Sequence, residues 1–245
     1  MKKNNKIGEH SNGSLFSFLF FGFAFDDSMP KSKNLFAALF ILLMICVGLA
    51  LFLVKMAGTA PKAMSAVQKS ALVVVDAQVG VLASVWESTR VINNLESLVR
   101  KARSAGVPVI WVQHSDKELQ YGTEPWNLAP NFVPLASEVV IHKNYNSSFA
   151  DTELDERLKS LGVTRIVLAG AASNWCIRAT AYAAVDRGYN LTLVGDAHST
   201  EPIQLADGKV VAAEAIVADL NTVFQFFSAP VVSTEVVTTQ AVSFK

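Results

Sequence analysis

Three residues of this chain have side chains that could together perform covalent catalysis, and each follows an apolar run of strand length. Asp76 ends the run ALVVVD, Lys143 follows VVIH, and Cys176 lies a short turn after RIVLAG. Because the carboxyl ends of parallel strands meet at one edge of a sheet, residues far apart in the sequence can converge there. A thiol beside a carboxylate and a lysine could act as a nucleophile, with the carboxylate accepting its proton.

Each of the three residues also has a purely structural interpretation. Free cysteines are among the most buried residue types, so Cys176 could simply fill space in the core. Its position at the start of a predicted helix favours a reactive thiol, since the positive end of a helix dipole stabilises the thiolate. Taken alone, Asp76 could cap a loop and Lys143 could be a solvated surface residue.

The pattern of apolar residues from Ala71 onward predicts alternating strands and helices. We expect strands at 71–76, 107–114, 138–142, 165–170 and 191–197, an edge strand at 231–237, and helices at about 91–102, from near 152, at 175–187 and at 209–226. Continuous apolar strands of this kind are typical of a mostly parallel sheet with helices on both faces. The chain contains neither GxGxxG nor GxxxxGK[ST], the motifs of dinucleotide and phosphate sites.

An uncharged apolar segment near the start of the chain predicts a membrane helix. Residues 35–54 carry no charge, and a helix of that length spans a hydrocarbon core of about 30 Å. We therefore expect a disordered or interfacial segment at 1–33, a transmembrane helix at 34–56, a linker at 57–69 and one α/β domain at 70–245.

The expected location is a membrane, through a single N-terminal anchor whose orientation the flanking lysines leave open. A cleaved signal peptide is an alternative, because residues 58–63 are mostly small, and it would make the mature protein secreted or periplasmic. Against this alternative, the apolar run is longer than a signal-peptide core of about 7 to 15 residues. Translation from Met64 would instead give a cytoplasmic protein.

Composition limits the possible partners. The 245 residues include 21 basic and 21 acidic side chains, and the basic ones form no block, so we expect no nucleic-acid surface. The only two cysteines are Cys46, inside the apolar segment, and Cys176. They cannot be interpreted as a disulfide framework, and Cys176 is expected to be a free thiol.

Taken together, the motifs resemble the isochorismatase-like cysteine hydrolases over residues 70 to 230. The resemblance rests on an Asp ending the first strand, a Lys ahead of an SxF segment, and a G-x-x-[ST]-x-x-C turn, here GAASNWC. A TA helix and a GY-x-[LV]-x-x-x-DA strand follow that turn. The resemblance implies a three-layer α/β/α, Rossmann-like fold with a doubly wound sheet. It also implies a catalytic triad of Asp76, Lys143 and Cys176.

The same resemblance implies further parts of the site. The peptide bond between Ala171 and Ala172 is expected to be cis and to turn the amides of Ala172 and Cys176 toward one point, as an oxyanion hole. A small molecule is the expected substrate, and a homo-oligomer is expected because relatives are frequently dimers or larger. The side chains expected to bind the substrate are His114, Trp126, Tyr145, Phe149, Asn174 and Trp175.

Departures from the family pattern narrow the expected chemistry. Gln113 stands where the nicotinamidase branch has a metal-binding Asp, and His114 alone is a poor metal site, so we expect no metal and no other cofactor. The branch that cleaves a vinyl ether commonly lacks the cysteine, so Cys176 favours hydrolysis of a C–N bond in a small amide, through a thioester. The alternative is a membrane-tethered module that binds a small molecule or a partner without turnover, against which the intact triad argues.

Overall fold

The computed structural model describes residues 39–40, 42–48 and 68–244. The chain divides into two units, Met1–Met64 and Ser65–Lys245. In the first unit the described residues are helical, and the rest of the predicted membrane segment 34–56 lies outside the described residues. Among the residues that are described, no helix has the length and apolar character needed to cross a membrane, and the anchor stays a prediction.

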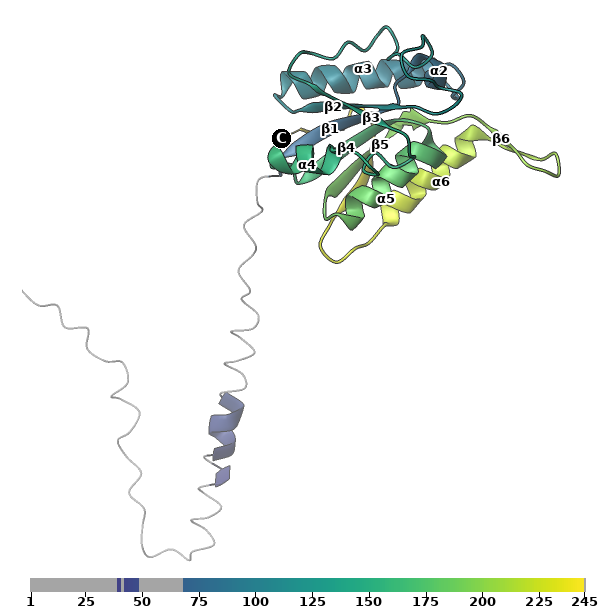
Figure 1. Ribbon diagram of the computed structural model, residues 1–245. Coiled ribbons are helices and arrows are strands. Elements are labelled where there is room, and N and C mark those ends of the chain that lie inside the picture. The colour runs from purple at the N-terminus through teal and green to yellow at the C-terminus, as the bar shows by residue number, and fades with distance from the viewer. Residues whose placement is uncertain (1–38, 41, 49–67, 245) are drawn as a thin grey trace, which may run out of the picture. The chain divides into compact units, whose positions relative to one another are not determined.

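The second unit is built on a six-stranded sheet in the order β3-β2-β1-β4-β5-β8 (Figure 1). Its strands are β1 (Ser70–Val75), β2 (Val109–His114), β3 (Val139–Lys143), β4 (Arg165–Ala171), β5 (Asn190–Ser199) and β8 (Thr234–Val237). Every neighbouring pair is parallel. The carboxyl ends of all these strands therefore lie along one edge, as the apolar runs predict.

Helices cover both faces of this sheet, which gives the expected three layers (Figure 1). On one face lie α2 (Val79–Leu82) and α3 (Ser88–Ser104), and on the other lie α4 (Leu154–Ser160), α5 (Arg178–Asp186) and α6 (Ala213–Phe226). The period-two alternation of a strand divides the apolar residues of β1 between the two cores. Leu72 and Val74 belong to the core that includes Leu95 of α3, whereas Val73 belongs to the core that includes Leu220 of α6.

A short hairpin replaces the start of one predicted helix. Residues 209–212 were expected to begin the last helix, but β7 (Val210–Val211) pairs antiparallel with β6 (Ile203–Gln204). The turn between them includes Gly208 at φ +83°, a conformation in which glycine costs little. The hairpin forms where the apolar periodicity predicts the start of a helix, and α6 therefore begins only at Ala213.

The close approach of β4 to β1 depends on Gly170. This residue pairs with Val75 at φ +127°, and a Cβ atom placed on it would lie 1.9 Å from the Val75 carbonyl oxygen. Asp76 follows Val75 directly, and β4 leads into the turn that carries Cys176. Glycine at this position therefore lets the two strand ends that carry the carboxylate and the thiol lie close together.

Replacing Gly170 with alanine is expected to lower the free energy of unfolding by about 3 kcal/mol, because the added methyl group overlaps the Val75 backbone. Chemical denaturation of the purified variant measures this loss. Gly106→Ala is the matched control, since Gly106 also has a positive φ but a Cβ atom there meets nothing within 4 Å. The control should lose only about 1 kcal/mol. Equal losses of unfolding free energy in the two variants would show that position 170 needs glycine only for its positive φ, and not for the close approach to Val75.

Candidate active site

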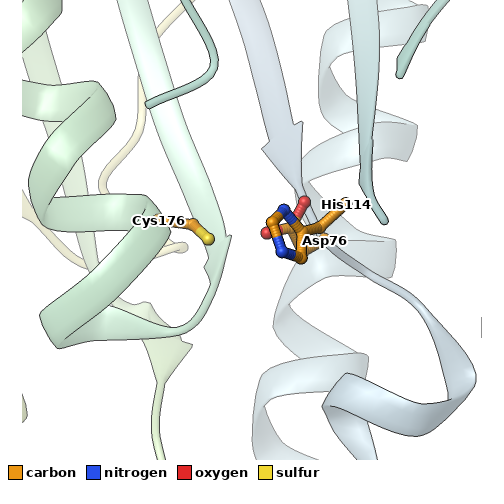
Figure 2. Close-up of side chains that lie close together, drawn as sticks. All are labelled: Asp76, His114 and Cys176. Carbon is orange, nitrogen blue, oxygen red and sulfur yellow. The ribbon is translucent and has the colours of Figure 1, made fainter. Parts of the chain in front are cut away.

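Four neighbouring strands bring the predicted triad together at the carboxyl edge of the sheet. Asp76 follows β1, Lys143 ends β3, and His114 ends β2 between them. Cys176 lies in η1 (Ser173–Ile177), a π-helical turn that follows β4. Figure 2 shows the thiol pointing from this turn toward Asp76 and His114. The three residues predicted as the triad therefore meet in one place.

The ammonium group of Lys143 connects the other groups. Its Nζ atom lies 2.9 Å from Asp76 Oδ2, 3.1 Å from Cys176 Sγ and 3.1 Å from His114 Nδ1. An ammonium has three N–H donors, so each can be directed at one of these acceptors. The lysine side chain is fully buried, and its charge is compensated by the paired carboxylate of Asp76 rather than by water.

His114 contributes one of the contacts of the Lys143 ammonium. Because Nδ1 of His114 accepts from the ammonium, its Nε2 atom carries the proton and donates to Asp116 Oδ2 at 3.2 Å. Partial burial raises the pKa of Asp116, but the amides of Leu119 and Glu118 and the imidazole outweigh this and hold it below the usual range. A neutral imidazole with a fixed tautomer thus orients the ammonium.

The carboxylate of Asp76 is placed to act as a base. Its Oδ1 atom is buried and has no hydrogen-bond partner among the described residues, and a carboxylate oxygen lies within 4.8 Å of Cys176 Sγ. Burial raises the pKa of Asp76, while the positive charge of Lys143 opposes that rise. A carboxylate with a raised pKa accepts a proton more readily than an ordinary aspartate.

The surroundings of Cys176 favour its protonated form, the thiol, over the thiolate. Burial and the negative charge of Asp76 raise its pKa to about 12, against the opposing effect of Lys143. A nucleophilic role for this sulfur would therefore require a base.

A buried chain of hydrogen bonds fixes the turn that carries Cys176. Ser173, the first residue of η1, lies 2.8 Å through its Oγ atom from His198 Nδ1, and His198 Nε2 lies 2.9 Å from Asn221 Oδ1 on α6. Asn221 donates through Nδ2 to Gly195, so its Oδ1 accepts from His198. Burial lowers the pKa of His198 to about 4, which keeps the imidazole neutral between its two partners.

The peptide bond between Ala171 and Ala172 is cis, as expected. Ala172 and Cys176 both line a cavity of about 450 Å³ that opens at this edge of the sheet. Asp76, His114 and Trp175 line the same cavity. This volume suits a small molecule, and the role of the two backbone amides as an oxyanion hole stays a prediction.

The remaining residues predicted to bind substrate are not among those that line the cavity. Phe149 packs in the core and stacks on Tyr189. Trp126 is buried and donates through Nε1 to Ser115. Tyr145 is exposed, and Asn174 accepts a hydrogen bond from Thr200. A role for these four residues in substrate binding stays a prediction.

Several cavity residues were missed by the sequence analysis. Asn146 lies three positions after Lys143, and its Oδ1 atom is 3.8 Å from Cys176 Sγ. Its place inside the segment KNYNSSF was the one signal that could have found it. Asp116, Glu118 and Glu201 also line the cavity, and they come from loops in which no periodic pattern predicts side-chain direction.

The donor atoms of Asp76, His114 and Cys176 lie close enough together to bind a metal ion. The Lys143 ammonium already lies within hydrogen-bond distance of all three residues. A metal at this point would meet the positive charge of that ammonium, so the donor set fits the lysine better than a metal. The absence of a metal from the reaction stays a prediction.

Comparisons with known proteins found similar sequences and a similar solved structure. The isochorismatase domain model matches residues 70–236. Streptothricin hydrolase from Streptomyces noursei is 35% identical over 61% of this chain, and the match spans 62% of that protein. Maleamate amidohydrolase from Pseudomonas putida is 35% identical over 37% of this chain and 45% of that protein. The crystal structure of an isochorismatase from Pseudomonas putida has a TM-score of 0.64 and 27% identity, covering 71% of this chain and 90% of the other.

Replacing Asp76 with asparagine is expected to lower the pKa of Cys176, because it removes a negative charge that opposes the thiolate and leaves the Lys143 ammonium beside the sulfur. The midpoint of thiol ionisation should fall by roughly 1 to 3 pH units. The rate of alkylation by iodoacetamide, followed against pH, measures it. Asp186→Asn, an exposed aspartate on α5, is the control and should leave the midpoint unchanged. A midpoint that stays the same or rises in Asp76→Asn would contradict the placement of Asp76 beside the thiol.

Proposed function

This chain belongs to the isochorismatase family, and we propose that it is a cysteine hydrolase that cleaves an amide-type C–N bond in a small molecule through a thioester. The observation that carries the proposal is the buried Lys143 ammonium, which joins the Asp76 carboxylate to the Cys176 sulfur. A domain that only binds a ligand does not need a thiol beside a base. The hydrolase names of the two relatives support the same class of reaction.

The proposed reaction begins with attack by sulfur. Asp76 accepts the thiol proton as the C–S bond forms, which is necessary because the pKa of Cys176 is about 12. The carbonyl electron pair moves onto the substrate oxygen. The backbone N–H groups of Ala172 and Cys176 would donate to that oxyanion and stabilise it. Lys143 keeps its three protons and stabilises the charges on either side of it.

The proposed intermediate then collapses and is hydrolysed. The oxyanion re-forms the carbonyl as the C–N bond breaks, and protonated Asp76 gives its proton to the departing ammonia or amine. A water molecule, deprotonated by Asp76, attacks the thioester carbon. The C–S bond breaks, the sulfur takes the proton back, and the carboxylic acid product leaves. Each proton that moves is thus held in turn by Asp76.

Replacing Cys176 with alanine is expected to lower kcat/KM at least about 1000-fold, because no other group forms the covalent intermediate. Ammonia or amine release from a panel of small amides by the full chain measures the change, and circular dichroism checks the fold. Cys46→Ala is the matched control, since it removes the other cysteine, which is free and exposed, and should keep full activity. Undiminished turnover by Cys176→Ala would contradict the proposal, and a wild type inactive on every amide would favour the binding module.

The dependence of kcat/KM on pH should show the ionisation of Asp76. The base must be deprotonated, so activity is present above its pKa and is lost as pH falls through it. Because burial raises the pKa of Asp76, the acid limb should lie above the ordinary aspartate value of about 3.9. Lys143→Met removes the charge that lowers this pKa, so the limb of its residual activity should move to higher pH. An acid limb at or below the ordinary aspartate pKa, or an acid limb that does not move in Lys143→Met, would contradict the assignment of Asp76 as the base.

A further inference from the structure

The cavity at the triad carries three carboxylates that the proposed reaction does not use: Asp116, Glu118 and Glu201. Among the described residues that line it there is no lysine or arginine. The cation of the site, Lys143, is already paired with Asp76. His114 adds no positive charge in this arrangement, because its Nδ1 atom accepts a hydrogen bond from the Lys143 ammonium. The lining therefore has a net negative charge.

Two of these carboxylates have no partner within the part of the chain that the structure describes. Glu118 and Glu201 are exposed, and within residues 68–244 their side chains make no ion pair or hydrogen bond. Glu118 follows β2 and Glu201 follows β5, so the charge comes from two separate loops. Both carboxylates are thus available to a group that enters the cavity.

Trp175 adds an aromatic surface to the same cavity. It directly precedes the nucleophile, its side chain is half exposed, and it lines the cavity. No ring or cation contact involves it among the described residues. In contrast, Trp86 already has the guanidinium of Arg90 over its ring. An exposed indole and carboxylates that line one cavity are a combination that attracts an organic cation.

We infer that the substrate is a small amide that also carries a positively charged ammonium or guanidinium group, held by Trp175 and the carboxylates of Glu118 and Glu201 while its carbonyl lies at Cys176. The amide part of this inference rests on the proposed function, whereas the cationic part rests on the lining alone. Negative charge at the cavity also disfavours an anionic substrate. The reaction is unchanged: amide and water give a carboxylic acid and ammonia or an amine.

The test compares three straight-chain amides of equal length whose far ends carry a methyl, a carboxylate or an ammonium group. For the full-length wild type, kcat/KM should be at least about tenfold higher for the ammonium amide than for the methyl amide, and lowest for the carboxylate amide. Added salt should reduce the preference, because it screens charges at exposed positions. An equal or reversed preference would overturn the inference while leaving the proposed hydrolysis intact.

Substitutions of residues that line the cavity test which side chains cause the preference for the ammonium amide. Glu118→Gln and Glu201→Gln should each lower kcat/KM for the ammonium amide about threefold, and Trp175→Leu should do the same, with recovery in Trp175→Phe. In each variant the ratio of kcat/KM for the ammonium amide to kcat/KM for the methyl amide should fall, a result that simple loss of structure, which lowers both values together, would not produce. Glu214→Gln, an exposed glutamate on α6 outside the cavity, controls for net charge and should change neither substrate. If Glu214→Gln lost the preference for the ammonium amide while the variants of the cavity lining kept it, the assignment of Trp175, Glu118 and Glu201 to the cation would be contradicted.

A binding measurement separates the inference from the proposed function. Calorimetry on Cys176→Ala, which has no side-chain nucleophile at this position, gives the affinity for each of the three amides without turnover. Tighter binding of the ammonium amide, weakened by Glu118→Gln and Glu201→Gln, would support the inference even if the wild type hydrolysed none of them. Equal affinities for the methyl and ammonium amides would overturn it even if both were hydrolysed.

Discussion

The rest of the site depends on the three contacts that the buried ammonium of Lys143 makes. Removing a charge from water costs several kcal/mol unless it is paired and hydrogen-bonded, and here Asp76, His114 and Cys176 together satisfy its three donors. The strand order explains how this is possible. The neighbouring strands β3, β2, β1 and β4 deliver, in that order, the lysine, the imidazole, the carboxylate and the turn with the thiol.

Close packing around this ammonium requires unusual backbone at two strand ends. Asp76 has φ +51°, a conformation in which aspartate is more tolerated than most residues. Gly170 lets β4 approach the Val75 carbonyl, and a buried imidazole, His198, links the nucleophile turn to α6. These features hold a thiol, a base and a cation together before any substrate enters, which is the preorganisation that covalent catalysis needs.

Apolar patterning in the sequence was sufficient to predict the sheet and to place the three triad residues at strand ends, since both depend on local periodicity. It was not sufficient for the ionisation of Cys176, because the two effects that raise the pKa of this thiol, burial and the charge of Asp76, both come from tertiary structure. It also did not identify Glu118 and Glu201 as residues that line the cavity. Phe149 turns into the core, whereas Glu118 and Glu201 face the cavity, and no periodicity governs side chains on loops.

The central claim is that Cys176 forms a covalent intermediate, and the mass of the intact protein tests it most directly. The full chain, mixed in excess with an amide that it hydrolyses and quenched in acid during the first turnover, should gain the mass of the acyl group. Digestion should locate that group on the peptide that contains Cys176. Turnover with no added mass, or with the acyl group on another residue, would contradict the account.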